Sequence, residues 1–375
     1  MWTRRLLLAA TAAAPGLATA LPALAQTRTI AIGFMLPASG EFSQYGERFR
    51  NSATMALDAF RAANKLPGAN VIIKYEDTRA DPRESVNIAR KFVDDREIVG
   101  VLGDFSSSAS MAAAQVFKEA GMAQLSPTAS HPDFVKMSPW QFRNITTQAQ
   151  EGPLLATWMV ENGLKRVAVI CIQNDWGQSV AAYFNAKLQQ LGGTTITTEF
   201  FNPGTRDFRA ILTKIARERP DGVYLGMFYE DGAALLQQRR QLGMRMPFYG
   251  TGSLYEPRLI ELAGREAVEG LRISTAFAAD SDEPVVRAFV EEYTRRYGSA
   301  PNMFSAVAFD ATSIMLAAIA RAGINVTRTQ LRDELARTKD FPGATGLTTF
   351  DPETREPNKA IARMEVRNGS FVVVR

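Results

Sequence analysis

The sequence predicts an α/β protein with two doubly wound, Rossmann-like lobes. Short apolar runs alternate with segments of helical periodicity from Thr29 to Leu125, and the same alternation begins again after Asn144. Alternation of this kind is typical of parallel sheets covered by helices on both faces. With 375 residues, of which 46% are hydrophobic and 22% charged, the chain is long and apolar enough for about two such domains.

The first 25 residues have the features of a cleavable signal peptide. Two arginines, Arg4 and Arg5, precede an apolar run that ends at Leu24, and small residues stand before a cut at Gln26. The arginine pair also fits a twin-arginine signal, so both export routes stay open. No cysteine stands at the cut, which argues against a lipid anchor. We therefore expect a periplasmic protein that begins near Gln26.

Charge and composition exclude several classes of function. Removing residues 1–25 lowers the formal net charge from +4 to about +2, which leaves no basic footprint for nucleic acid. No later segment has ~20 uninterrupted apolar residues, so we expect no further membrane span. The single cysteine, Cys171, lies in an apolar strand, and the single histidine is His131. We expect no metal site and no cofactor, because no cluster of metal ligands occurs.

The first lobe begins with two strand–helix units. A strand from Thr29 to Pro37 leads through a polar, glycine-containing loop into a helix that runs to about Asn64. The loop lacks the GxGxxG spacing of dinucleotide-binding folds. A second strand, Val71–Glu76, precedes a helix that starts with Asp81 as N-cap and Pro82 at its first position.

Two polar turns follow the next two strands of this lobe. The strand Ile98–Gly103 leads into three serines and a helix over Ser110–Ala120, which Ser106 can cap. The strand Met122–Leu125 ends in Ser126–Ser130. Adjacent parallel strands would present these hydroxyls at their carboxyl ends, where open α/β sheets hold ligands, and a helix N-terminus attracts anions. The pattern predicts a site for a small anion.

A second series of elements follows, and the last part of the chain returns to both lobes. The later helices are expected to complete the first lobe, and the final strands to pair with the second. We therefore expect lobe I to comprise residues 26–144 and 277–355, and lobe II residues 145–276 and 356–375. The predicted elements are Gly152–Asn162 (helix), Val167–Ile172 (strand), Gly177–Leu191 (helix), Thr195–Phe200 (strand), Asp207–Arg217 (helix), Gly222–Gly226 (strand), Asp231–Leu242 (helix), Pro247–Tyr249 and Leu271–Thr275 (strands), Glu283–Tyr297, Met303–Ala322 and Thr329–Thr338 (helices), and Ile361–Val366 and Phe371–Val374 (strands).

Several short motifs, taken in their order and spacing, resemble one family. They are Gly40 with Gln44-Tyr45-Gly46, Glu76-Asp77 with Pro82, Gly103 to Ser108, Ser126 to Ser130, Asn174 to Gly177, and Tyr224 to Gly226 with Tyr229. From Thr29 to Arg375 the chain resembles the type I periplasmic solute-binding proteins of the branched-chain amino acid ABC transporter family. The resemblance implies two lobes joined by three crossover segments, a ligand in the cleft between them, and delivery of that ligand to ABC permease subunits. We expect the protein to be a monomer.

The same resemblance implies a set of ligand-binding residues. Ser107 and Ser130 resemble the hydroxyls that hold a ligand carboxylate, with Ser106 beside them. The backbone of Thr128 and Ala129 lies next to the ligand in this family pattern. Aromatic residues would form the walls of the cleft, although core packing is an equal alternative for each large ring. These aromatic residues are Tyr45, Phe105, Trp176 and Tyr229.

One position departs from the family pattern. Where the amino-acid binders carry an acid for the ligand ammonium, this chain has Gly252 by our alignment. Glu230 is a possible substitute, although acids are common at helix starts for other reasons. Without an acid, the ligand would be an aromatic or aliphatic carboxylate that lacks an ammonium. We expect a small, apolar, carboxylate-bearing solute, with branched-chain or aromatic amino acids slightly favoured.

Two other classes of function are alternatives. A hydrolase would need a nucleophile and a base that face each other, whereas Ser130, His131 and Pro132 are adjacent in one turn, and no G-x-S-x-G motif occurs. We therefore predict no enzyme and no catalytic residues. A stand-alone sensor of amide or urea-type solutes is the second alternative, because one fold can serve several roles.

Overall fold

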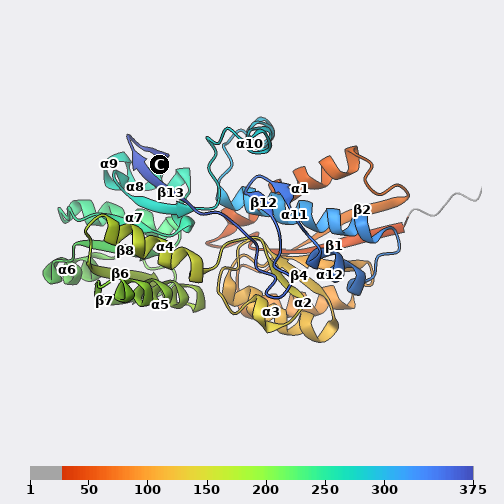
Figure 1. Ribbon diagram of the computed structural model, residues 1–375, viewed down its shortest axis with the longest axis horizontal. Coiled ribbons are helices and arrows are strands. Elements are labelled where there is room, and N and C mark those ends of the chain that lie inside the picture. The colour runs from red at the N-terminus through yellow and green to blue at the C-terminus, as the bar shows by residue number, and fades with distance from the viewer. Residues whose placement is uncertain (1–27, 375) are drawn as a thin grey trace, which may run out of the picture.

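The computed structural model describes residues 28–374, which form two lobes side by side (Figure 1). Each lobe is built on its own sheet, and helices cover the faces of both sheets. The predicted signal peptide lies outside the described residues. The predicted lobe boundaries at residues 144, 276 and 355 stay predictions.

The first sheet is entirely parallel, with strand order β2-β1-β3-β4-β5. Its central strand β3 has the sequence IVGVL and is buried at every position, as a strand covered on both faces should be. The elements of this lobe are β1 (Arg28–Leu36), α1 (Ser43–Ala62), β2 (Ala69–Asp77), α2 (Pro82–Asp94), β3 (Ile98–Leu102), α3 (Ser107–Ala120), β4 (Ala123–Ser126), the 3₁₀ turn η1 (Val135–Met137) and β5 (Gln141–Arg143).

The second sheet has strand order β14-β13-β10-β9-β8-β6-β7. Its first five strands in the chain are parallel, and β13 and β14 join antiparallel at one edge. The elements are α4 (Gln148–Glu161), β6 (Arg166–Ile172), α5 (Asp175–Gln190), β7 (Thr194–Phe201), α6 (Arg209–Glu218), β8 (Gly222–Gly226), α7 (Tyr229–Gln241), β9 (Phe248–Gly250), the 3₁₀ turn η2 (Gly252–Leu254), α8 (Pro257–Ala263), α9 (Arg265–Val268), β10 (Arg272–Thr275), β13 (Ala362–Arg367) and β14 (Ser370–Val374).

The chain leaves the second sheet after β10 and returns to it at β13. Between them lie α10 (Pro284–Tyr297), α11 (Met303–Ala322), α12 (Arg328–Ala336) and the hairpin β11 (Phe341–Gly343) and β12 (Gly346–Thr348). The helix α11 packs against α1, and α12 contacts β3 and β4. Figure 1 shows these blue helices beside the red and orange elements of the first sheet. The helices α11 and α12 therefore pack with elements of the first sheet, and β13 and β14 pair with the second sheet, while the predicted division of residues 277–375 between the lobes stays a prediction.

The helix α11 is the one described helix that is long and apolar enough to cross a membrane, which the sequence prediction did not foresee. The mean hydropathy of an 18-residue segment of this helix is 1.7, but 78% of that segment is buried inside the protein. Because its neighbours α1 and α12 cover it, its apolar character serves the core of lobe I.

Two features differ from the predicted elements. The prediction omitted β5, α8, α9, β11 and β12, which are all short. The predicted start of the first helix of lobe II at Gly152 was wrong, because α4 begins at Gln148. Thr147 and Gln150 form a capping box there, and Pro153 lies beyond the first turn of the helix, whereas the prediction had it in the first turn.

Candidate ligand-binding cleft

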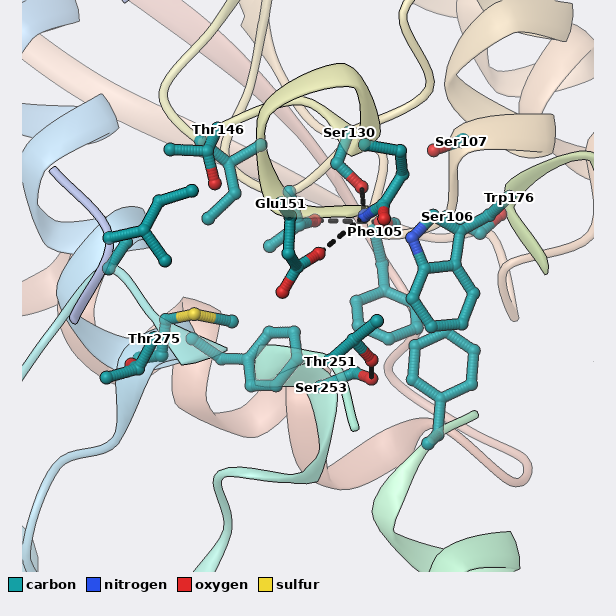
Figure 2. A pocket seen from close by; sticks show the side chains of 18 of the residues that line it. Phe105, Ser106, Ser107, Ser130, Thr146, Glu151, Trp176, Thr251, Ser253 and Thr275 are labelled. Atoms are coloured by element: carbon teal, nitrogen blue, oxygen red, sulfur yellow. Dashed lines mark hydrogen bonds between the residues drawn. The ribbon is translucent and has the colours of Figure 1, made fainter. Parts of the chain in front are cut away.

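A cavity lies between the two lobes, at the carboxyl ends of parallel strands from both sheets. About 670 Å³ of space there, including its open mouth, is not filled by protein atoms. Lobe I contributes residues that follow β3 and β4, such as Ser107 and Ser130. Lobe II contributes residues that follow β6, β8 and β9, such as Trp176, Phe228 and Thr251. Figure 2 shows the labelled side chains of both lobes, such as Ser130, Trp176 and Thr251, around one central space.

Two serine hydroxyls form one polar end of the cavity. Ser107 Oγ accepts a hydrogen bond from the backbone N–H of His131 at 3.2 Å, and Ser130 Oγ accepts one from Gln148 Nε2 at 3.2 Å. Within residues 28–374 neither hydroxyl donates to a protein acceptor. Because each serine accepts from the protein, its single proton is left to donate to a ligand oxygen. This arrangement suits a carboxylate.

The start of α3 also favours an anion at this end of the cavity. Ser106 Oγ accepts from the backbone N–H of Ala109 at 3.2 Å, so Ser106 is the predicted N-cap. Thr128 Oγ1 donates to the carbonyl oxygen of Phe105 at 2.7 Å and is thereby committed to the protein. The first turn of α3 carries partial positive charge, which favours an anion at this end of the cavity.

Glu151 from α4 supplies an acidic group to the cavity. Glu151 is largely buried, with 8% of its surface exposed to solvent. Glu151 Oε1 accepts from the backbone N–H of Gly252 at 2.9 Å and from Ser274 Oγ, and Oε2 accepts from Gln148 Nε2 at 2.7 Å. Among the described residues, no lysine, arginine or histidine forms an ion pair with it. The cavity therefore contains a carboxylate that has neutral donors but no cationic partner from the protein.

Gln148 connects the two polar groups. Its Nε2 donates to both Ser130 Oγ and Glu151 Oε2, while its Oε1 is buried and has no hydrogen-bond partner among residues 28–374. The orientation of the amide follows from Glu151, since a carboxylate at 2.7 Å requires a donor. Figure 2 marks the hydrogen bonds that Ser130 and Glu151 accept with dashed lines. The serine end and the acid are thus held in a fixed relation.

Apolar side chains line the remaining walls. The rings of Trp176 and Phe228 stack with centroids 5.0 Å apart, and Phe105 packs against Phe228 at 5.3 Å. Met303 and Phe304 from the start of α11 line the cavity as well. A small ligand with an apolar part would remove this surface from water.

Some of the predicted site residues line the cavity. These are Phe105, Ser106, Ser107, Thr128, Ser130 and Trp176. Two others lie just behind its surface. Tyr45 is 1% exposed and its ring stacks on that of Phe105 with centroids 4.5 Å apart, and Ala129 is fully buried, with its carbonyl oxygen bound by Arg143.

The other three predicted residues do not line the cavity either. Tyr229 and Glu230 lie where α7 meets α1 of the other lobe. Tyr229 donates to the side chain of Gln44, and Glu230 Oε2 accepts from the Tyr45 hydroxyl at 3.4 Å. Gly252 reaches the site only through its N–H bond to Glu151, and a Cβ at position 252 would lie 2.9 Å from the carbonyl oxygen of Ser274.

Sequence reasoning missed several lining residues, of which Gln148 and Glu151 matter most. Both residues precede the predicted helix, which starts at Gly152. The capping box of Thr147 and Gln150 was the signal that could have placed the start correctly and put positions 148 and 151 on one helix face. The other missed residues are Ser108, Ile145, Thr146, Asn174, Phe228, Thr251, Ser253, Thr275, Ala276, Met303, Phe304 and Ile361.

Comparisons with known proteins match most of the described chain. The family described as periplasmic binding protein matches residues 29–370. A leucine-, isoleucine-, valine-, threonine- and alanine-binding protein of Pseudomonas aeruginosa is 26% identical over 350 residues, which cover 90% of this chain and 92% of the relative. A solved structure from Rhodospirillum rubrum, assigned provisionally to branched-chain amino acid ABC transport, is 47% identical with a TM-score of 0.71, and covers 92% of this chain and 100% of that one.

Other solved structures share the fold. The branched-chain amino acid binding protein LivJ from Streptococcus pneumoniae, solved with isoleucine, is 25% identical with a TM-score of 0.85, and covers 92% of this chain and 99% of that one. A solute-binding protein from R. palustris, solved with benzoate, has a TM-score of 0.86 at 20% identity over 92% of this chain and 95% of that one, which concerns the fold alone.

These matches confirm the predicted family resemblance and the type I periplasmic binding fold. The family works outside the cytoplasm, which places this protein there as well. Two lobes around a ligand cavity, together with a family match over residues 29–370, show that the chain belongs to the periplasmic binding protein family and is a non-enzymatic, solute-binding component of an ABC transporter.

Proposed function

We propose that the protein binds an apolar α-amino acid, branched-chain or aromatic, in the periplasm and delivers it to ABC permease subunits. The observation that carries this proposal is the Glu151 carboxylate in the cavity wall. A ligand ammonium would supply the cationic partner that Glu151 lacks among the described residues. The amino-acid specificities of the Pseudomonas relative and of LivJ agree with this assignment.

The cost of burying an unpaired charge explains why Glu151 favours such a ligand. A carboxylate removed from water is strongly penalised unless hydrogen bonds and an opposite charge compensate it. Glu151 has the hydrogen bonds from Gln148, Gly252 and Ser274. The opposite charge would come from the ligand.

The close spacing of Ser130 and Glu151 also fits an α-amino acid. Ser130 and Glu151 are both bonded to the same amide nitrogen of Gln148, so they lie close to one another. An α-amino acid carries its carboxylate and ammonium on one carbon, which allows both contacts at once. Its side chain would then lie against the wall formed by Trp176 and Phe228.

A second candidate is a carboxylic acid that lacks an ammonium. The stacked rings of Trp176 and Phe228 favour it, since they offer a flat apolar wall to an aromatic acid. The benzoate-bound structure from R. palustris shows that this fold accommodates such ligands. A ligand of this kind would leave Glu151 with its neutral hydrogen-bond donors alone. Amide or urea-type solutes remain a third outcome of the same test.

Paired titrations distinguish the candidates. Calorimetry with leucine and phenylalanine is compared with 4-methylpentanoate and 3-phenylpropanoate, which lack only the ammonium. We expect the amino acids to bind more tightly. Because a hydrogen bond to a charged group contributes about 1.5–3 kcal/mol, Glu151→Gln should weaken leucine binding roughly tenfold or more, and it should not weaken binding of the deaminated acids.

The matched control is Glu161→Gln, which removes an exposed acid of the same helix. This variant should change the affinity neither for leucine nor for the deaminated acids. Tighter binding of the deaminated acids would contradict the amino-acid assignment and favour the second candidate. Binding of acetamide or urea, with none of the four carboxylates, would contradict both.

A further inference from the structure

Arg143, the last residue of β5, is a charged side chain that is completely buried. Its side chain is 0% exposed. Burial lowers the pKa of its guanidinium to about 10, so the group remains a cation at neutral pH. An arginine is almost never fully buried unless strong partners compensate its charge. The partners of Arg143 therefore indicate what it does.

The guanidinium group donates hydrogen bonds to three backbone carbonyl oxygens of one turn. Nη1 donates to the carbonyl oxygens of Ala129 at 2.7 Å and His131 at 2.8 Å, and Nη2 donates to that of Pro132 at 3.3 Å. On its other side, Nε lies 3.0 Å from Glu356 Oε2. We call residues Ala129–Pro132 the carboxylate turn, because Ser130 lies within it.

The carboxylate turn holds both serine hydroxyls in place. Ser130 is part of it, and the backbone N–H of His131 binds Ser107 Oγ. The carbonyl oxygen of Ser130 accepts from the backbone N–H of Gln148 at 3.1 Å, which ties the turn to α4. Without Arg143, buried carbonyl oxygens of this turn would lose their donor, which is costly and favours rearrangement of the turn.

We propose that Arg143 is the positioning residue of the cleft: it binds the carbonyl oxygens of the carboxylate turn, and thereby directs the Ser130 and Ser107 hydroxyls at the ligand. The planar guanidinium reaches several acceptors at once, which a lysine ammonium cannot do in the same geometry. Of the two experiments described below, only the double-mutant cycle rests on the proposed function, because it assumes that a ligand carboxylate binds at these serines.

The first experiment needs no ligand. Hydrogen–deuterium exchange of residues 127–134 is measured in wild type, Arg143→Met and Arg143→Lys. We expect exchange in the carboxylate turn to rise tenfold or more in Arg143→Met and less in Arg143→Lys, with β6 and β8 unchanged. If Arg143→Met does not fold, Arg143→Lys carries the comparison.

The matched control is Arg328→Met. Arg328 also donates to backbone carbonyl oxygens of lobe I, at Val93 and Ile98, but it does not touch the cleft. It should leave exchange in the carboxylate turn as in wild type. Wild-type exchange of that turn in the Arg143 variants would overturn the proposal.

The second experiment is a double-mutant cycle with leucine, or with whichever of the four carboxylates binds wild type. Ser130→Ala should weaken binding about tenfold in wild type and twofold or less in the Arg143→Met or Arg143→Lys background. Glu151→Gln should cost the same factor in both backgrounds. An equal Ser130→Ala loss in both backgrounds would overturn the proposal. If wild type binds none of the four, the proposed function fails, and the exchange measurement alone decides the role of Arg143.

Discussion

A serine hydroxyl has one proton, and the group from which the oxygen accepts decides where that proton is free to point. Ser107 and Ser130 each accept from a fixed donor, the His131 backbone and the Gln148 amide. Their protons are thereby available to the cavity. Thr128, which lies between them in the sequence, donates to the backbone of Phe105 and is not available in this way.

Replacing either serine should therefore weaken carboxylate binding. We expect Ser107→Ala and Ser130→Ala each to raise the Kd for leucine roughly tenfold or more, since each loses a bond to a charged group worth about 1.5–3 kcal/mol. Calorimetry measures the affinity, and circular dichroism checks the fold. Ser52→Ala is the control, because Ser52 is buried in the same lobe and its hydroxyl has no partner among residues 28–374. Unchanged affinity in both cleft variants would refute the assignment.

At this scale the sequence predicts the serines but not the acid. Hydroxyls that directly follow apolar strands are visible in the sequence, because strand ends define the cavity edge. The acid is not, since Glu151 reaches the cavity from a helix and bonds to Gly252, which is distant in sequence. The lack of space at position 252 explains why the acid cannot come from there.

Helix starts decide which residues reach the cleft. The helix α4 begins with the capping box of Thr147 and Gln150, where Gln150 Oε1 accepts from the backbone N–H of Thr147 at 3.0 Å. Gln148 and Glu151 lie in the first turn that this box stabilises. The remote helix α12 begins with the same device, formed by Thr327 and Gln330.

The two capping boxes offer a matched comparison. We expect Gln150→Ala and Gln330→Ala each to lower the free energy of unfolding by about 0.5–1 kcal/mol. Only Gln150→Ala should weaken leucine binding, by several fold, because it loosens the turn that carries Glu151. Thermal unfolding and calorimetry measure the two effects. Equal affinities for both variants would mean that the start of α4 is held by other contacts.

Most elements could be predicted because their local signals agree. The N-caps Asp81 and Ser106 are where the sequence places them, and buried strands such as β3 and β6 read as apolar runs. The short elements β5, α8 and α9 could not be predicted, since a few residues carry too little periodicity. For α4, Gly152 and Pro153 read as a boundary, but the capping box upstream sets the start.

At the scale of the whole molecule, the two lobes touch where α1 of the first lobe meets α7 and the residues near it in the second lobe. Glu41 pairs with Arg206 at 2.7 Å, and Arg48 pairs with Glu256 at 2.7 Å. Between these pairs the Tyr45 hydroxyl donates to Glu230. The contact therefore places several carboxyl groups where the lobes touch.

Burial raises the pKa of Glu230 from its ordinary value of 4.5 to about 7. A raised carboxyl pKa means that the folded protein binds this proton more tightly, so the stability gained is present below about pH 4.5 and is lost as the pH rises to about 7. Glu230→Gln should therefore stabilise the protein at pH 8 by about 1–2 kcal/mol relative to wild type, and less at pH 5.

Urea unfolding at the two pH values measures this difference. Glu161→Gln, at an exposed site, should show no such pH dependence. The pKa of Asp231 is likewise raised by burial to about 7, so part of the slope should remain in Glu230→Gln. Parallel pH profiles for wild type and Glu230→Gln would contradict the assignment to Glu230.

During synthesis, the strands β1 to β5 leave the ribosome long before α11, the helix that packs on α1 and completes the core of their lobe. A chain that ends before Met303 lacks this helix, so the apolar faces that it covers stay open to solvent. The core of the lobe that starts first therefore stays open until late in synthesis, and the second sheet gains its last strands, β13 and β14, later still. A nascent chain of this protein remains incompletely folded, and open to chaperones and proteases, until nearly its whole length has been made.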